Sequence, residues 1–261
     1  MMEVSKAMQG AEVATRCCDQ HGEYQSQHVT LGRTEFWTTC PACTEAGTKS
    51  DAQKIIDDIN AGRRQAVMNN TMQRAAIPPR FMDRRFANYR ATCSNSAKAL
   101  ETVREYAENF ADSLASGRSL ILMGTVGTGK THLAASAAHA LIAQGYTAVF
   151  TSVLSAVRSV KETYGHGATQ TERQAINALI APDLLIIDEV GVQFGSATEE
   201  MILFEIINGR YEQMKPTIII SNLAMEPLKK YLGERVFDRL REGGGKAVVF
   251  NWESHRAKVA A

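Results

Sequence analysis

The sequence predicts an α/β fold built on a doubly wound, five-stranded parallel sheet. From Ala97 onward, apolar runs of strand length alternate with longer segments of helical period. The runs are apolar at successive positions, which indicates strands that are buried on both faces. The segments between them are long enough for the helices of right-handed parallel crossovers.

Five apolar runs are the predicted strands of this sheet. In chain order they are Ser119–Met123, Thr147–Ser152, Leu184–Ile187, Thr217–Ser221 and Ala247–Phe250. A chain of 261 residues, 44 % of them apolar, can bury the core that such a sheet requires. The predicted α/β domain therefore occupies residues 96–261.

The charge of the chain is nearly balanced. Its 29 Lys and Arg residues face 28 Asp and Glu residues, a formal net charge of +1, so any nucleic-acid surface has to be local. No apolar run is long enough to span a bilayer, and the first residues have no apolar signal core. We therefore expect a cytoplasmic protein that has no membrane partner.

The cysteines predict a zinc-binding module over residues 1–50. Two pairs with two-residue spacing carry the prediction, Cys18 with His21 and Cys40 with Cys43. Thiolates and an imidazole suit tetrahedral Zn²⁺, which would supply folding free energy to a segment that has few aliphatic residues. Cys17 is an alternative ligand to Cys18, and four reduced thiols without metal are the alternative to a zinc site. Cys93 has no predicted role.

Residues 51–95 are predicted to form a helical and basic linker. Asp51–Arg74 is polar and lacks proline, which predicts a connecting helix that ends before Pro78. Arg74–Arg90 then carries five arginines against one acid, interleaved with three aromatic residues, Phe81, Phe86 and Tyr89. We expect this basic segment to fold back with its aromatic side chains in the core of the next domain, and contact with nucleic acid is the alternative.

The first strand leads directly into a phosphate-binding motif. Residues 124–131 read GTVGTGKT, which matches GxxxxGK(S/T) between a strand and a helix. The glycines let backbone N–H groups converge on a phosphate at the N-terminus of the helix. Lys130 is expected to reach the β- and γ-phosphates of ATP, and Thr131 to offer its hydroxyl to Mg²⁺.

Two acids and an amide follow later strands at the same edge of the sheet. Asp188 is expected to hold Mg²⁺, Glu189 to orient the attacking water, and Asn222 to face the γ-phosphate. The predicted nucleotide-binding residues are Gly124, Gly127, Thr128, Gly129, Lys130, Thr131, His132 and Asp188.

These motifs together resemble those of the AAA+ ATPases, in which the residue matching Asn222 is sensor 1. Leu232–Arg241 and Val248–Arg256 look like segments of the DnaC helicase loaders and the IstB transposition helpers, in a phage or prophage version. The resemblance covers about residues 76–261. It implies that Arg239 is an arginine finger acting across a subunit boundary and that Arg256 is sensor 2. Surface ion pairs are the alternative role for Arg239.

The resemblance also carries expectations about the whole protein. Ten residues follow Asn251, so we expect no C-terminal helical lid. The implied function is an ATP-dependent loader that binds a hexameric replicative helicase and places it on single-stranded DNA, with ATP binding and hydrolysis controlling DNA grip and release. The resemblance also implies self-assembly through the ATP sites. By analogy it favours contact between the zinc module and the helicase, and DNA is the alternative partner of this module.

Two alternative functions and one alternative role for a helix stay open. The first is an IstB-like transposition helper that acts on a transposase, and the second is a nucleotide-gated adaptor with little turnover. The third concerns the predicted helix Val153–Tyr164, which lies where helicase loaders insert a helix that faces DNA. Arg158, Lys161 and Tyr164 would either contact single-stranded DNA or form a solvated face.

Overall fold

A computed structural model describes residues 12–31, 34–47, 75–165, 167–192 and 196–255. The chain divides into two compact units, Met1–Ala66 and Val67–Ala261, which we describe one at a time. The predicted connecting helix over residues 51–74 lies outside the described residues, and so does Arg256. The division into segments 1–50, 51–95 and 96–261 stays a prediction.

The N-terminal unit holds a small antiparallel sheet of order β1-β2-β3. Its strands are β1 (Val13–Cys18), β2 (Gly22–Leu31) and β3 (Thr34–Trp37), and residues 41–47 are helical. Among the described residues of this unit, only Ser26, Val29 and Cys40 are buried. Such a small core supplies little hydrophobic stabilisation, so the fold of this unit requires a further source of stability, such as a bound metal ion.

The C-terminal unit contains the predicted five-stranded parallel sheet. Its strands are β4 (Leu120–Gly124), β5 (Ala148–Ser152), β6 (Leu184–Val190), β7 (Thr217–Ser221) and β8 (Lys246–Phe250). Their order across the sheet is β5-β6-β7-β4-β8, and each strand coincides with one predicted run. The parallel pairing and the five strand positions are therefore confirmed.

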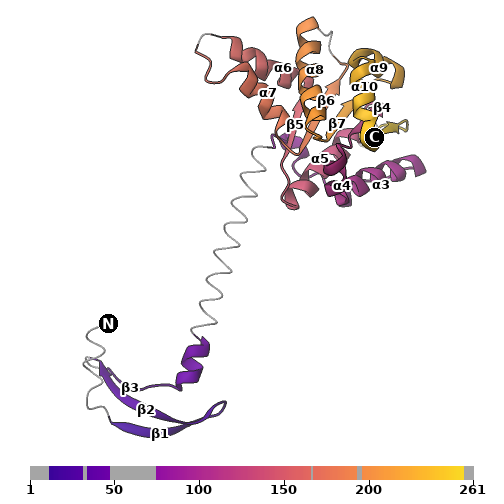
Figure 1. The fold of residues 1–261 in the computed structure, drawn as a ribbon. Helices are drawn as coiled ribbons and strands as arrows, with labels where there is room; N and C mark the ends of the chain where they lie inside the picture. The colour runs from indigo at the N-terminus through magenta and orange to yellow at the C-terminus, as the bar shows by residue number, and fades with distance from the viewer. Residues whose placement is uncertain (1–11, 32–33, 48–74, 166, 193–195, 256–261) are drawn as a thin grey trace. The chain divides into compact units, whose positions relative to one another are not determined.

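Helices cover both faces of this sheet (Figure 1). One face packs against α3 (Ser94–Glu108), α4 (Phe110–Ser116) and α5 (Lys130–Ala143). The other packs against α6 (Val153–Lys161), α7 (Glu172–Ile180), α8 (Ala197–Glu212), α9 (Met225–Leu232) and α10 (Glu234–Arg241). Along β7, Ile218 and Ile220 enter the first core and Ile219 enters the second, which explains why the three central residues of the strand are all apolar.

The basic segment folds back onto the C-terminal unit, as expected. It contains two short 3₁₀ helices, η1 (Pro79–Phe81) and η2 (Phe86–Asn88). Phe81 and Phe86 are half-buried against the core, and Tyr89 is buried in it. Just before these helices, the carbonyl of Ala75 accepts a hydrogen bond of 2.8 Å from the amide of Phe150 in β5. The aromatic side chains of this segment are therefore part of the core.

Candidate functional site

The phosphate loop connects β4 to α5, and its glycines are required by their backbone geometry. Gly124, Gly127 and Gly129 have φ angles of 123°, 80° and 96°. A Cβ at Gly124 would lie 2.3 Å from the carbonyl oxygen of Phe250, and one at Gly129 would lie 2.7 Å from the ring of Tyr89. Any other residue at Gly124 or Gly129 would have both a strained backbone and a steric clash, so the loop requires glycine at these positions.

Lys130 begins α5 and points its ammonium group into the loop. Its side chain is almost fully buried, and Nζ donates hydrogen bonds to the carbonyl oxygens of Gly124 at 2.8 Å and Thr125 at 2.7 Å. The positive charge is thus held where the loop would surround a phosphate.

Two aromatic side chains hold the loop from outside the motif. The carbonyl oxygen of Thr128 accepts hydrogen bonds from the hydroxyl of Tyr89 at 3.2 Å and from the indole N–H of Trp252 at 3.1 Å. Tyr89 comes from the basic segment and Trp252 from the end of the sheet. Sequence reasoning did not assign either residue to the site.

Asp188 and Thr131 meet at the carboxyl edge of the sheet. The hydroxyl of Thr131 donates to Oδ2 of Asp188 at 3.0 Å, and the amide of Glu189 donates to Oδ1 at 2.7 Å. Burial raises the pKa of Asp188, and these two hydrogen bonds oppose that shift. A hydroxyl and a carboxylate side by side are the oxygen ligands that suit Mg²⁺, so the residues present fit this ion.

Glu189 has a backbone conformation that is rare for a side-chain-bearing residue. Its φ angle is 61°, and the pairing of β6 with β7 shifts register between Ile187 and Val190. Such a bulge changes the direction of the side chains at the end of a strand. Strained backbone conformations of this kind are concentrated at functional sites. The bulge presents the exposed carboxylate of Glu189 to the same pocket that Asp188 lines.

A pocket of about 1060 Å³ brings these residues together, a volume large enough for a nucleotide. Its lining includes predicted residues from three segments of the chain: Gly127, Gly129, Lys130, Thr131, His132, Asp188, Glu189 and Asn222. Gly124 and Thr128 lie in the loop itself, beside this lining.

The pocket also takes three arginines from the basic segment, Arg80, Arg84 and Arg90. The sequence signal was present in the clustered arginines, but their part in the nucleotide pocket was missed. Two histidines of α5 hold this segment in place: the ring Nε2 of His132 lies 3.1 Å from the carbonyl oxygen of Arg85, and that of His139 lies 3.1 Å from that of Phe81. Burial lowers the pKa of both rings.

Arg239 lies on α10, outside the residues that line this pocket. Its guanidinium lies 5.0 Å from the ring centroid of Tyr211 and 5.9 Å from that of Phe204, and it donates to the side-chain oxygen of Asn208. All three partners belong to α8, and they are two rings and an amide instead of the carboxylates of a surface ion pair. Arg239 is therefore held against α8 and does not line the nucleotide pocket of its own chain.

The four predicted zinc ligands converge in the N-terminal unit. The sulfur atoms of Cys18, Cys40 and Cys43 and a ring nitrogen of His21 all lie within 4.8 Å of one another. Nδ1 of His21 is 3.7, 3.8 and 3.3 Å from these sulfur atoms, in that order. Three soft sulfur ligands and one imidazole fit tetrahedral zinc.

The geometry favours Cys18 over Cys17 as a ligand. Cys17 is exposed, and its thiol lies 4.0 Å from the carbonyl oxygen of Cys18. Hydrogen bonds, first from the backbone of Gln20 and then from the His21 side chain, lower the pKa of the Cys18 thiol to about 6. The neighbouring Cys18 raises the pKa of Cys43 to about 11.

The predicted DNA-facing side chains of α6 and η3 (Glu162–Tyr164) have partners within the chain. Nζ of Lys161 lies 3.4 Å from a carboxylate oxygen of Glu199, and the hydroxyl of Tyr164 donates to Glu172 at 2.6 Å. Arg158 is exposed. These contacts agree with a helix face that is exposed to solvent, and contact of this helix with DNA stays a prediction.

Comparison with known proteins gives a family and several relatives. A family model described as "IstB-like ATP binding protein" matches residues 34–258. The replicative helicase loader DnaC of Escherichia coli (strain K12) is 38 % identical over 192 residues, which are 74 % of this chain and 77 % of that protein. An uncharacterized protein of the same strain, YdaV, is 33 % identical over 211 residues, 80 % of this chain and 83 % of that one.

Solved structures show the same fold. The crystal structure of a DnaC helicase loader matches with a TM-score of 0.59 at 23 % identity, covering 66 % of this chain and 99 % of that chain. AMPPCP-bound DnaA from Aquifex aeolicus matches with a TM-score of 0.57 at 25 % identity, covering 70 % and 54 %. In the described part of the chain, no helix is long and apolar enough to cross a membrane.

Proposed function

Because the chain belongs to the IstB/DnaC-like family of AAA+ ATPases, we propose that it is an ATP-dependent loader of a replicative helicase. It would bind the hexameric helicase and place it on single-stranded DNA during the initiation of replication. The observation that carries the proposal is the 38 % identity to DnaC over 77 % of that protein, in a chain whose phosphate loop, two acids and sensor asparagine line one pocket.

ATP binding follows from the loop and its lysine. The backbone N–H groups of the loop and the ammonium of Lys130 would bind the β- and γ-phosphates. Thr131 and Asp188 would hold Mg²⁺, which neutralises charge on the phosphate oxygens. Arg80 and Arg84, which also line the pocket, would add positive charge.

Hydrolysis requires a positioned water molecule. The carboxylate of Glu189 would accept a hydrogen bond from this water and orient it, and the side-chain amide of Asn222 would donate to the γ-phosphate. Arg239 of a neighbouring subunit would stabilise the charge that develops, and the resemblance assigns Arg256 as sensor 2. ATP binding and hydrolysis would then control the grip on DNA and the release of the helicase.

The N-terminal unit would supply the partner contact. Cys18, His21, Cys40 and Cys43 would hold the Zn²⁺ that stabilises this unit, and its surface would contact the helicase.

The deciding experiment is a pull-down of the full chain against the replicative hexameric helicase of its host, with and without ATP and single-stranded DNA. We expect ATP-dependent capture by the wild-type chain and by Glu189→Gln, which keeps the ATP-binding groups, and loss of the ATP dependence in Lys130→Ala. A chain that captures no helicase in any nucleotide state would contradict the loader function.

Turnover separates the loader from a nucleotide-gated adaptor. DNA-stimulated ATP hydrolysis that Glu189→Gln abolishes, while ATP still binds, supports the loader. Slow hydrolysis in the wild-type chain that DNA does not change supports the adaptor.

The family description favours one further candidate, an IstB-like transposition helper. Capture of a transposase on duplex DNA, in preference to the helicase on single-stranded DNA, would support this function in place of the loader.

A further inference from the structure

Among the described strands, β8 is one of the two edge strands of the five-stranded sheet, and β5 is the other. β8 pairs with β4 on one side only. The amide of Lys246 donates to the carbonyl of Ser119, and the carbonyl of Phe250 accepts from the amide of Thr125. Alternate residues of a parallel strand bond to the same neighbour, so the N–H and C=O groups of Ala247 and Val249 point to the outer edge.

This edge is the floor of a groove of about 620 Å³. α3 supplies one wall, on the side of the first core. The start of α9 and the end of α10 supply the other wall. Val249 is 51 % exposed within the groove, which is high for an apolar residue in a strand. An edge of this kind presents backbone donors and acceptors at strand spacing.

The groove is basic. Lys98 of α3, Arg241 of α10 and Lys246 of β8 line it, and no Asp or Glu residue does so in the part of the chain that the structure describes. The first turn of α3, marked by Asn95, reaches the same groove and adds the partial positive charge of a helix N-terminus.

We propose that the β8 edge binds an extended acidic peptide segment of a partner protein, which adds a sixth strand to the sheet. The backbone of the peptide would pair with Ala247 and Val249, and its acidic side chains would meet the three cations. A second copy of β8 would bring its own Lys98, Arg241 and Lys246 to the same basic groove and is disfavoured by charge. Single-stranded DNA offers phosphates to the cations but no groups at strand register for the edge. This surface does not depend on the loader function.

The test is the fluorescence anisotropy of a labelled peptide of about ten residues, alternating Glu and Val and long enough for one strand. The key variant is Val249→Pro, which removes an outward N–H and leaves the ladder to β4 intact. Val249→Ala is the matched control, because it keeps that N–H. A Lys98→Glu, Lys246→Glu double variant tests the charge. ATP binding by each variant reports that the chain is folded.

We expect the proline and charge-reversal variants to weaken binding at least about tenfold, the loss of roughly one or two backbone hydrogen bonds or of the charge match. Val249→Ala should bind nearly as the wild type does, and a Lys-Val peptide should not bind. Peptide binding that Val249→Pro leaves unchanged would overturn the proposal. So would an oligothymidylate that displaces the peptide and loses affinity in the charge variant alone.

Hydrogen exchange of the wild-type chain gives a second test that needs no variant. The amides of Ala247 and Val249 should exchange more slowly when the Glu-Val peptide is bound. Unchanged exchange at both positions under saturating peptide would also overturn the proposal.

Discussion

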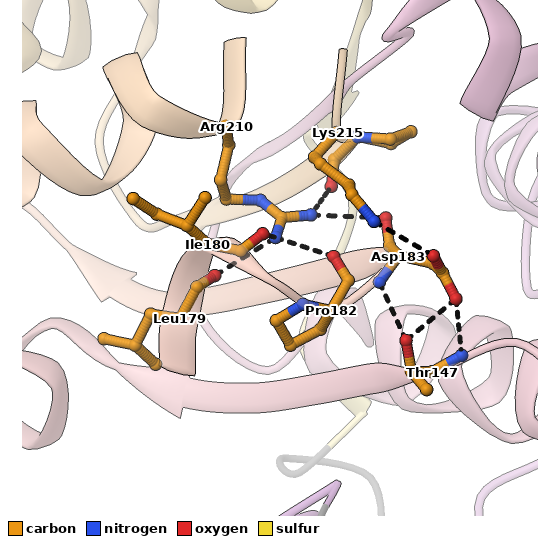
Figure 2. Close-up of polar contacts among 8 residues, drawn as sticks. Thr147, Leu179, Ile180, Pro182, Asp183, Arg210 and Lys215 are labelled. Carbon is orange, nitrogen blue, oxygen red and sulfur yellow. Dashed lines mark hydrogen bonds and ion pairs between the residues drawn. The ribbon is translucent and has the colours of Figure 1, made fainter. Parts of the chain in front are cut away.

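Arg210 in α8 is a fully buried arginine that joins several segments of the C-terminal unit (Figure 2). All of its donor nitrogens are used at the end of the sheet opposite the phosphate loop. The acceptors are the hydroxyl of Thr217 and the carbonyl oxygens of Leu179, Ile180, Pro182, Asp183 and Pro216. Burial lowers the pKa of Arg210 to about 9, which leaves it charged at pH 7.

Replacing Arg210 with Met should lower the free energy of unfolding by about 3–5 kcal/mol, because several carbonyl groups lose their donors in the interior. Arg210→Lys should not restore it, since an ammonium has three donors and cannot span six acceptors. Urea denaturation measures the change. The exposed Arg158→Ala is the control and should stay within about 0.5 kcal/mol of the wild type. A fully stable Arg210→Met chain would show that the carbonyl groups find other donors.

His139 predicts a pH dependence of stability. Its Nε2 contacts the carbonyl of Phe81, and its Nδ1 is buried without a hydrogen-bond partner among the described residues. Burial lowers the pKa of His139, so the unfolded chain binds its proton more tightly than the folded chain does. The stabilisation that comes from the neutral, buried ring of His139 is present above its unfolded pKa of about 6.5. It is lost as the pH falls through the lower pKa of the folded chain.

We therefore expect the free energy of unfolding to fall between about pH 7 and pH 5, and to fall less in His139→Gln, whose amide keeps a donor toward Phe81. Thermal melting across this pH range measures both. The same pH slope in the two proteins would assign the effect to other groups.

The site residues that could be predicted from the sequence are those that belong to a motif with a known chemical role. Lys130, Thr131 and Asp188 follow from the phosphate motif and the end of a buried strand. Tyr89 and Trp252 could not be placed, because an aromatic side chain that donates to a loop carbonyl looks the same in sequence as one that fills the core. The positive φ of Glu189 was also hidden, since it depends on a bulge between two strands.

At the scale of elements, the five strands could be predicted because each contains a run of apolar residues at successive positions. The basic segment was harder. Its aromatic residues pointed to the core, but three of its arginines line the nucleotide pocket, and only the packing of η1 and η2 against α5 brings them there. A cluster of arginines in the sequence predicts a basic surface, but only the tertiary structure shows that this surface belongs to the nucleotide pocket.

The small sheet of the N-terminal unit predicts a dependence on metal. The described part of this unit buries few residues, so metal binding should supply most of its folding free energy. Purified protein should contain about one zinc per chain. Cys18→Ser should lose it, and the adjacent Cys17→Ser, the matched control, should keep it. Elemental analysis measures the metal, and limited proteolysis measures the fold.

Removal of zinc by a chelator should make residues 12–47 sensitive to protease and leave ATP binding by the C-terminal unit unchanged, because the C-terminal unit has a hydrophobic core of its own. A metal-free N-terminal unit that resists protease as well as the zinc-loaded one would contradict the zinc site. Loss of metal from both cysteine variants would leave the choice between Cys17 and Cys18 open.

At the scale of the whole molecule, the position of Arg239 predicts a catalytic site shared between subunits. α8 holds Arg239 through Phe204, Asn208 and Tyr211, outside the lining of its own nucleotide pocket. If this arginine completes the pocket of a neighbour, Lys130→Ala and Arg239→Ala chains should each lose hydrolysis alone and recover it when they are mixed. Each variant keeps the half of the site that the other lacks.

The size of the recovery follows from random assembly. In a closed ring of equal amounts of the two variants, about a quarter of the interfaces join an intact pocket to an intact arginine, so about a quarter of wild-type turnover should return. Steady-state ATP hydrolysis at several mixing ratios measures it. Arg235→Ala is the matched control, because Arg235 is exposed on the same helix and should remain active alone. Mixtures that stay inactive at every ratio would make Arg239 a residue that joins α10 to α8, since only an arginine acting across the boundary can be replaced by a neighbour.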